Sequence, residues 1–312
     1  MREGSRRLHL PGLAHRLAGP ARLLALVLAP VLALGLPAAA QAGQVRTGAG
    51  SLTGPFVALG DSFAAGDLIP ASPSGAPAGC LRSSHDYGAD AAATLGLTYI
   101  DATCTGATTA DMTAPQRVTL GTHAPQFSYL APDDSVVTLT IGGDNIAFLG
   151  ILETCAKLSV TDLPGDPCRR YYTAGGTDRL LAAIDATAPK VAAVLQGIHL
   201  RAPNARVLLV GYPDILPVAG QGCWPMVPLA LGDLAYLRGL EITLNQMLAS
   251  VAAANGATFV DTYQPTIGHD ACTSASVKDV EGLIPSSPAY PFHPNRRGEQ
   301  VMADAVLAAL GA

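Results

Sequence analysis

Short apolar runs recur along the chain, and each is bounded by glycine, proline or polar residues. A short continuous apolar run is typical of a strand that is buried on both faces of a sheet. Segments with helical periodicity separate most of these runs. The runs cover residues 56–59, 97–100, 136–141, 206–211 and 257–260.

The helical segments alternate with the apolar runs, which predicts right-handed βαβ crossovers and a parallel sheet covered on both faces. We expect helices over residues 87–96, 178–200, 231–254 and 296–311, the second of them kinked or divided by Pro189. The predicted fold class is therefore α/β.

Three stretches between these elements are rich in proline and glycine, namely residues 67–82, 150–176 and 213–230, and each holds one or two cysteines. We expect them to be loops that disulfides hold together and that shape a pocket. Trp224, the single tryptophan, lies in the third stretch. It would either line the pocket or anchor its loop by packing.

The N-terminal segment has the layout of an export signal. Arginines precede an apolar stretch at residues 23–36, and Ala-Gln-Ala at residues 40–42 has the small-residue pattern of a cleavage site. A membrane anchor is the alternative, but Pro30 interrupts the apolar stretch, which is shorter than the ~20 residues of a spanning helix. We expect residues 1–42 to be a signal peptide and residues 43–312 to be one secreted domain, with the general and twin-arginine routes both open.

Charge narrows the classes of partner. The formal net charge is −5 at pH 7, and the predicted signal peptide carries more basic than acidic residues, so the rest of the chain is more acidic still. Residues 43–312 contain no basic cluster and no basic amphipathic helix. This composition argues against binding to nucleic acid and against electrostatic docking on anionic membranes.

All six cysteines fall within residues 43–312, and an even number in an exported chain favours disulfides. A metal site is the alternative, but the sequence has no C-x-x-C and no histidine at ligand spacing from a cysteine pair. We expect neither a metal nor a cofactor. The residues alone leave the pairing open, and we favour pairing of successive cysteines.

A serine lies where the first strand should end. Gly60 allows a sharp turn, and Ser62 is delivered to the carboxyl edge of the sheet, where open parallel sheets bind their ligands. A hydroxyl is a poor nucleophile until a base takes its proton. Among the seven histidines, His293 is placed best for that role, because it lies in a proline-rich turn that leads into the last helix.

Four short blocks occur in order along the chain, each in a fitting strand or loop context. They are Gly60-Asp61-Ser62, Cys104-Thr105-Gly106-Ala107, Gly142-Gly143-Asp144-Asn145 and Phe292-His293-Pro294-Asn295. Together they resemble the blocks of the GDSL or SGNH hydrolase superfamily, and most closely its secreted actinobacterial lipase and esterase branch. The resemblance spans residues 43–312.

The resemblance implies a three-layer αβα sandwich with a flavodoxin-like parallel sheet. It implies that Ser62 attacks an acyl carbonyl, with His293 acting first as base and then as acid. It also implies three disulfides between successive cysteines, which are Cys80–Cys104, Cys155–Cys168 and Cys223–Cys272.

The family stabilises the oxyanion with three donors, which the resemblance assigns to the backbone N–H groups of Ser62 and Gly106 and to an asparagine side chain of the third block. Here the last two residues of that block are exchanged to Asp144-Asn145. An ionised Asp144 in the donor position would oppose the oxyanion. We therefore expect Asn145 to donate, with Asp144 as the alternative and a purely structural role for the pair also open.

The acid that this family usually has three residues before its histidine is replaced by Tyr290. Some members use a Ser-His dyad in which a backbone carbonyl orients the imidazole, and Tyr290 or Pro291 could supply it; we expect Tyr290. Asp261 and Asp270 are distant candidates for a triad, but we interpret them as strand-end and turn residues.

The sequence thus predicts a secreted, monomeric serine ester hydrolase that cleaves lipid or other acyl esters through an acyl-enzyme on Ser62, without a stable membrane anchor. A carbohydrate deacetylase or a polyester hydrolase on the same fold is one alternative. A secreted binding protein on a decayed hydrolase scaffold is the other, because the third block and Tyr290 depart from the family pattern.

Overall fold

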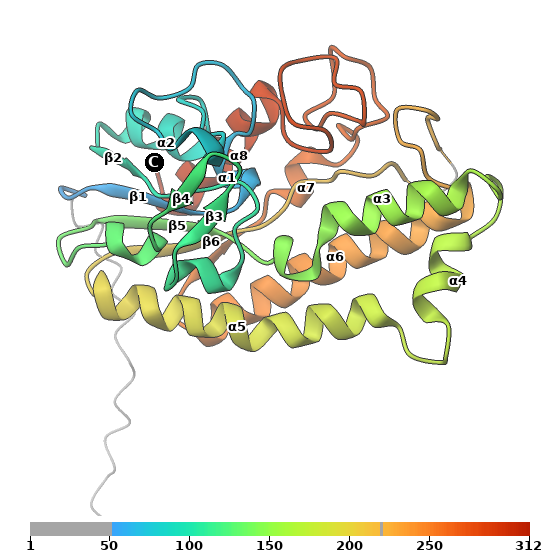
Figure 1. Cartoon of the computed structure of the whole chain (residues 1–312). Helices are drawn as coiled ribbons and strands as arrows, with labels where there is room; N and C mark the ends of the chain where they lie inside the picture. Colours follow the sequence, from blue (N-terminus) through green and yellow to red (C-terminus); the bar gives the residue numbers. More distant parts are fainter. Residues whose placement is uncertain (1–51, 219–220) are drawn as a thin grey trace, which may run out of the picture. The chain divides into compact units, whose positions relative to one another are not determined.

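The structure is a computed structural model, which describes residues 52–218 and 221–312. The predicted signal peptide, residues 1–42, lies outside the described residues and stays a prediction. The described chain is built around a five-stranded sheet in which every strand pair is parallel (Figure 1). Its strands are β1 (Phe56–Gly60), β2 (Tyr99–Asp101), β5 (Val136–Thr140), β6 (Arg206–Val210) and β7 (Thr258–Val260).

The strands lie in the order β2-β1-β5-β6-β7. Counted along the chain, this is the second, first, third, fourth and fifth strand of the sheet, which is the flavodoxin-like order. The order reverses between β1 and β5, so the crevice beyond their carboxyl ends is the switch point where such sheets bind ligands. Both strands are buried along their whole length, as their continuous apolar runs predict.

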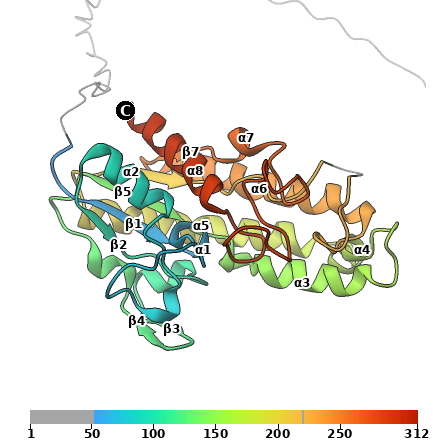
Figure 2. The ribbon, with the colours of Figure 1, turned by 90° about the horizontal axis from the view of Figure 1, so that it is seen from above.

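Two helices cover one face of the sheet, α2 (Tyr87–Leu95) and α8 (Arg296–Leu310). Figure 2 looks down on this layer, with the two helices side by side above the strands. Phe56 of β1 and Val136 of β5 pack there in one apolar cluster with Val306 of α8. Side chains at alternate strand positions therefore supply this half of the core.

Two longer helices cover the opposite face, α5 (Arg179–Arg201) and α6 (Leu231–Ala254). Val57 of β1, the neighbour of Phe56, points to this side and packs in a second cluster with Leu195 of α5 and Leu248 of α6. Helices on both faces of a parallel sheet make a three-layer αβα sandwich, so the predicted fold class is confirmed.

Pro189 does not divide α5, which is one continuous helix of 23 residues with the proline inside it. A proline inside a helix removes one backbone hydrogen bond and costs about 3 kcal/mol, which burial of one side of the helix in the core offsets. By length and composition alone α5 could cross a membrane. Val191, Leu195 and Ile198 instead pack in the core, so we assign it to the folded domain.

The stretch at residues 150–176 is not a loop, contrary to the prediction. It is largely occupied by α3 (Phe148–Ser159) and α4 (Pro167–Thr173), which a short turn joins. Pro164 and Gly165 lie in that turn and Gly175 and Gly176 after α4, but Gly150 lies within α3 and Pro167 begins α4. The residues of α3 have an apolar face on the core. The prediction was wrong because it weighed composition over periodicity.

The remaining elements are short and lie near the ends of the strands. They are α1 (Ser62–Ala65), α7 (Tyr263–Thr266), the hairpin β3 (Gln116–Val118) and β4 (Gly121–His123), and the 3₁₀ helices η1 (Ala78–Cys80), η2 (Thr109–Met112), η3 (Gln126–Tyr129) and η4 (Asp144–Ile146).

The six cysteines form three disulfides, Cys80–Cys104, Cys155–Cys168 and Cys223–Cys272. These are the pairs that the resemblance implies. The first links η1 to the loop after β2, and the second links α3 to α4. Trp224 beside the third is 48% exposed, so it is not a packed anchor, and it is not among the residues that line the hollows beside Ser62.

Candidate active site

The turn after β1 is fixed by the backbone of Gly60. This residue has φ +144°, and a Cβ there would come within 2.4 Å of the Thr140 carbonyl oxygen of β5, so only glycine fits. Gln126 holds the same residue from the other side: its Oε1 accepts from Gly60 N–H at 2.7 Å, and its Nε2 donates to the Gly60 carbonyl at 2.9 Å. The chain then enters α1 with Ser62 as its first residue.

Ser62 meets a histidine from the far end of the chain. His293 lies in the loop before α8, and its Nε2 is 2.6 Å from Ser62 Oγ. Both side chains are buried, Ser62 to 7% and His293 to 1% exposure. The fold therefore brings together the two residues that the sequence pointed to as nucleophile and base, and it does so at hydrogen-bond distance.

The carbonyl that orients His293 belongs to Pro291 and not to Tyr290. Nδ1 of His293 is 2.8 Å from the Pro291 oxygen, whereas the Tyr290 oxygen accepts from the backbone N–H of His293. A carbonyl can only accept, so Nδ1 carries the proton and Nε2 is left to accept from the Ser62 hydroxyl. The Tyr290 assignment was wrong because sequence spacing cannot show which of two adjacent carbonyls faces the ring.

No carboxylate of residues 52–218 or 221–312 takes part in this contact. Asp261 Oδ1 accepts from the N–H groups of Tyr263 and Gln264, and Asp270 Oδ1 accepts from the Cys272 N–H. Both residues therefore cap local turns, as their sequence context predicted. Within the described residues, the imidazole bonds only to Ser62 and the Pro291 carbonyl, which is the arrangement of a dyad.

Aromatic rings enclose the imidazole. The Phe63 ring lies 4.4 Å from it between centroids, and the Tyr290 ring meets it edge to face at 5.2 Å. Burial among these rings disfavours the imidazolium and lowers the pKa of His293 to about 4, although the Pro291 carbonyl acts in the opposite direction. The histidine is therefore neutral near pH 7, which is the form that can accept a proton.

The loop with the predicted second oxyanion donor lies after β2. Gly106 has φ +73°, which turns its peptide in a way that side chains disfavour. Within the described residues, neither its N–H nor that of Ser62 donates to another protein group, so both are free for a ligand. Ser62 and Gly106 line one hollow together.

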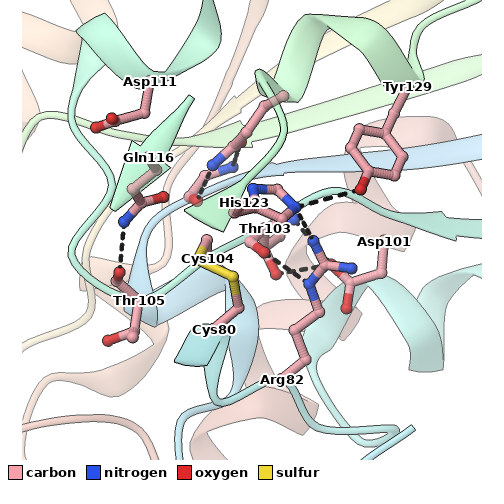
Figure 3. The surroundings of a disulfide bond; sticks show 12 residues. Cys80, Arg82, Asp101, Thr103, Cys104, Thr105, Asp111, Gln116, His123 and Tyr129 are labelled. Carbon is pink, nitrogen blue, oxygen red and sulfur yellow. Dashed lines mark hydrogen bonds and ion pairs between the residues drawn. A yellow bond between two sulfur atoms is a disulfide. The ribbon is translucent and has the colours of Figure 1, made fainter. Parts of the chain in front are cut away.

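A set of contacts fixes this loop from outside, as Figure 3 shows. The Cys80–Cys104 disulfide ties it to η1, and Gln116 Nε2 donates to the Thr105 carbonyl at 2.7 Å. Thr105 N–H also donates to the Cys80 carbonyl. Thr105, the residue just before Gly106, is therefore held at both its N–H and its carbonyl, and the Gly106 N–H is left free.

Buried Arg82 holds the start of the same loop (Figure 3). Its Nε donates to the Thr103 carbonyl at 2.7 Å and lies 3.5 Å from Asp101, and its Nη2 is 2.7 Å from Nε2 of His123. Burial and the guanidinium lower the pKa of His123 to about 4, so His123 is a neutral acceptor. The sequence did not reveal this network, since no motif or spacing links Arg82 to the loop after β2 or to His123.

His123 also lies beside the disulfide, and one of its ring nitrogens and the sulfurs of Cys80 and Cys104 lie within 4.8 Å of one another. Three such atoms could hold a metal only if the sulfurs were thiolates. The disulfide removes that possibility in the oxidised protein.

The third block does not place Asn145 at Ser62. Asn145 Nδ2 donates to Thr109 Oγ1 at 2.8 Å, and its Oδ1 accepts from the Thr109 N–H at 3.1 Å. Asp144 instead lines both hollows that border Ser62. The structure therefore brings Asp144, the alternative in the sequence-based prediction, to the serine and turns the preferred Asn145 away.

A hydrogen-bond chain joins the first and third blocks. Asp61 caps α1 by accepting from Phe63 N–H at 3.1 Å, and its second oxygen accepts from Tyr212 O–H at 2.5 Å. The Tyr212 oxygen in turn accepts from Gly143 N–H at 2.8 Å. Burial, followed by the field of Asp144, raises the pKa of Asp61 well above its usual range. This role of Tyr212 was missed, because it joins residues from three separate strand ends.

An apolar hollow extends from Ser62 between α3, α5 and α6. Its wall includes Phe148, Ile184, Leu240 and Leu244. A more open hollow lies on the other side of Ser62, along the Gly106 loop and Tyr290. The serine thus stands between an apolar channel and a wider, more polar mouth.

Comparison with known proteins places these features in a family. A model of the GDSL-like lipase/acylhydrolase family matches residues 58–301. Lipase 2 of Streptomyces coelicolor is 38% identical over 82% of this chain and 85% of its own, and an esterase of Streptomyces scabiei is 28% identical over 81% and 84%. The crystal structure of phospholipase A1 from Streptomyces albidoflavus has the same fold, with a TM-score of 0.67 and 24% identity over 82% of this chain and 98% of that one.

The family match covers most of the described chain, from β1 to α8, and includes all four sequence blocks. The similarity to Lipase 2 extends over more than two thirds of both chains. The chain therefore belongs to the GDSL-like lipase/acylhydrolase family and is a carboxylic ester hydrolase.

Proposed function

We propose that this protein hydrolyses acyl esters through a covalent acyl-enzyme on Ser62, with His293 as its general base and acid. The observation that carries the proposal is the 2.6 Å contact between Ser62 Oγ and His293 Nε2. A nucleophile within hydrogen-bond reach of a base, itself oriented by a third group, is the general arrangement of covalent acyl transfer. The Pro291 carbonyl is the orienting group here.

In the first half-reaction Ser62 Oγ attacks the carbonyl carbon, and its proton passes to His293 Nε2. The tetrahedral intermediate collapses when the bond to the alcohol oxygen breaks and His293 returns its proton to that oxygen. In the second half-reaction water attacks the acyl-enzyme, with His293 again taking and returning the proton. This step releases the free acid and restores the Ser62 hydroxyl.

The N–H groups of Ser62 and Gly106 would stabilise the oxyanion during both steps. Two observations support this role. Neither N–H donates to another group among the described residues, and the two residues line one hollow. A fixed donor of this kind is commonly worth about 3 kcal/mol of transition-state stabilisation. The disulfide and Gln116 would keep the Gly106 loop from moving away as charge develops.

We infer that the substrate carries an apolar acyl chain. The hollow beside Ser62 is lined by aliphatic and aromatic side chains, which would bury a hydrocarbon chain and gain about 25 cal/mol for each Å² of apolar surface. The wider mouth at Tyr290 would take the alcohol part. The names lipase and esterase of the similar Streptomyces proteins agree with this substrate class.

We further propose that the enzyme works outside the cell as a monomer without a membrane anchor. The three disulfides support an oxidising compartment. The export-signal pattern of residues 1–42 supports secretion. Size-exclusion chromatography of the purified mature chain and analysis of the culture medium test these two points.

A series of p-nitrophenyl esters of increasing acyl length tests the reaction and the substrate class together. We expect turnover that rises with chain length from acetyl to longer acyl groups, and loss of turnover in Ser62→Ala. Ser250→Ala, which removes an exposed hydroxyl from α6, is the matched control and should keep the wild-type rate. Equal rates for the wild type and Ser62→Ala would contradict the proposal and favour a binding protein. Preference for acetyl esters would contradict the acyl-chain assignment.

A further inference from the structure

Asp144 is the side chain of the third block that lies at the hollows beside Ser62, and no described residue holds its carboxyl group. It lines the apolar hollow with Ser62 and His293 and the second hollow with Ser62 and Gly106. Among the described residues, its carboxyl group has no hydrogen bond and no ion pair, whereas Asn145 is bonded twice to Thr109. Asp144 therefore occupies the place where a third oxyanion donor would lie.

The groups around this carboxyl are acidic or neutral. Among the described residues, the titratable groups that line a hollow with it or act on it are Asp61, Asp67, Asp111, Tyr212, Glu241, Tyr290 and His293. Asp61 and Asp67 lie at the two ends of α1, Asp111 lies in η2, and Tyr212 follows β6. None of them is a cation when His293 is neutral, so nothing in this set favours an ionised Asp144.

Burial and the field of Asp111, in that order, raise the pKa of Asp144 to about 6. Below that pH the side chain is a carboxylic acid, which has an O–H donor. Above it the side chain is a carboxylate, which only accepts and which repels an oxyanion.

We propose that Asp144 is a catalytic residue in its protonated form and donates its O–H to the oxyanion, beside the N–H groups of Ser62 and Gly106. This inference rests on the proposed function. The proton of Asp144 stays on its oxygen throughout: it is shared in a hydrogen bond while the carbonyl oxygen is negative and released from that bond when the C=O double bond forms again. No further reactant is needed.

The enzyme then works within an acidic window. His293 must be neutral to accept the Ser62 proton, so activity rises with pH through about 4. Asp144 must be protonated to donate, so activity falls as pH rises through about 6. The two groups give a bell-shaped dependence of kcat/KM on pH, with its maximum between these values.

The test is the pH dependence of kcat/KM for the wild type, Asp144→Asn and Asp144→Ala, with the released acid measured by chromatography so that the readout does not change with pH. On the alkaline limb, above pH about 6, kcat/KM of the wild type should fall about tenfold for each pH unit. Asp144→Asn always has a donor, so its alkaline limb should disappear. Asp144→Ala has neither donor nor charge, so it should be flat above the acid limb but roughly 100-fold below Asp144→Asn.

Asn145→Ala is the matched control, because it changes the neighbouring residue and should keep the alkaline limb where the wild type has it. A wild-type profile that stays flat through neutral pH would overturn the inference, and so would an alkaline limb that persists in Asp144→Asn. Labelling of Ser62 by a fluorophosphonate separates the two proposals. Labelling with no Asp144-dependent limb rejects only the role of Asp144, whereas failure to label Ser62 at any pH rejects the acyl-enzyme itself.

Discussion

The turns after β1 and β5 meet at the same edge of the sheet but are held in different ways. In the first turn, Gln126 bonds both polar groups of Gly60, and Asp61 accepts from two donors. In the second turn, Gly143 and Asn145 are held, but the Asp144 carboxyl between them has no protein partner in the described part of the chain. Groups that must be fixed before reaction are thus bonded by the fold, and a group left unbonded at the serine is available to substrate.

Replacing the base, His293, should have the largest effect on turnover. His293→Ala should slow turnover by about 10⁴-fold or more, because Ser62 would lose its proton acceptor. The ester assay measures the loss, and circular dichroism confirms folding. His199→Ala is the control and should leave turnover intact, since the His199 side chain on α5 bonds only to the Asn255 carbonyl in the part of the chain that the structure describes. Turnover by His293→Ala within about tenfold of the wild type would exclude His293 as the base.

Removing the Cys80–Cys104 disulfide should affect both stability and reaction. We expect Cys80→Ser with Cys104→Ser to lower the free energy of unfolding by about 2 to 5 kcal/mol, measured by urea denaturation. It should also lower kcat, because the disulfide holds the Gly106 loop. The matching change at Cys155 and Cys168 should lower stability and spare kcat, so an equal loss of kcat in both would contradict a specific role for the first bridge.

A smaller effect is expected from Gly106→Ala. A Cβ there meets only Gln116 Nε2, at 3.9 Å, so the cost is backbone strain of about 1 to 2 kcal/mol and a shift of the donor N–H. We expect kcat/KM to fall by about 10- to 100-fold. Gly96→Ala is matched in φ, at +68°, lies in open space at the end of α2, and should lose similar stability without losing activity. Equal activities of the two variants would show that the Gly106 N–H is not used.

The smallest effect concerns the residue that the sequence favoured as oxyanion donor. Asn145→Ala removes two bonds to Thr109, so it should lower the free energy of unfolding by about 1 kcal/mol and change turnover by less than about threefold. Thermal unfolding and the ester assay measure the two effects. A roughly 100-fold slower turnover at intact folding would return Asn145 to the oxyanion.

The fold and the catalytic pair could be predicted because their signals are local. Apolar runs marked the strands. Ser62 follows the first strand of the sheet, β1, and His293 lies in the turn before α8, the last helix. What failed depended on the direction of a group within a turn. The adjacent carbonyls of Tyr290 and Pro291 point in different directions, and so do the adjacent side chains of Asp144 and Asn145. The spacing of residues in a sequence does not contain these directions.

The networks around the site were also beyond the sequence. Tyr212 joins the turns after β1, β5 and β6, and Arg82 joins the loop after β2 to His123. Each contact is made between residues far apart in the chain, so neither periodicity nor a local motif contains it. In both cases the signal lies in the packing of loops at one edge of the sheet.

The acyl-enzyme is tested most directly by stopping the reaction with acid during turnover of a slowly hydrolysed ester and mapping the adduct by peptide mass spectrometry. We predict one acyl group on the peptide that contains Ser62, and none in Ser62→Ala. Turnover with no acylated peptide, or with the acyl group on another residue, would contradict covalent catalysis by Ser62.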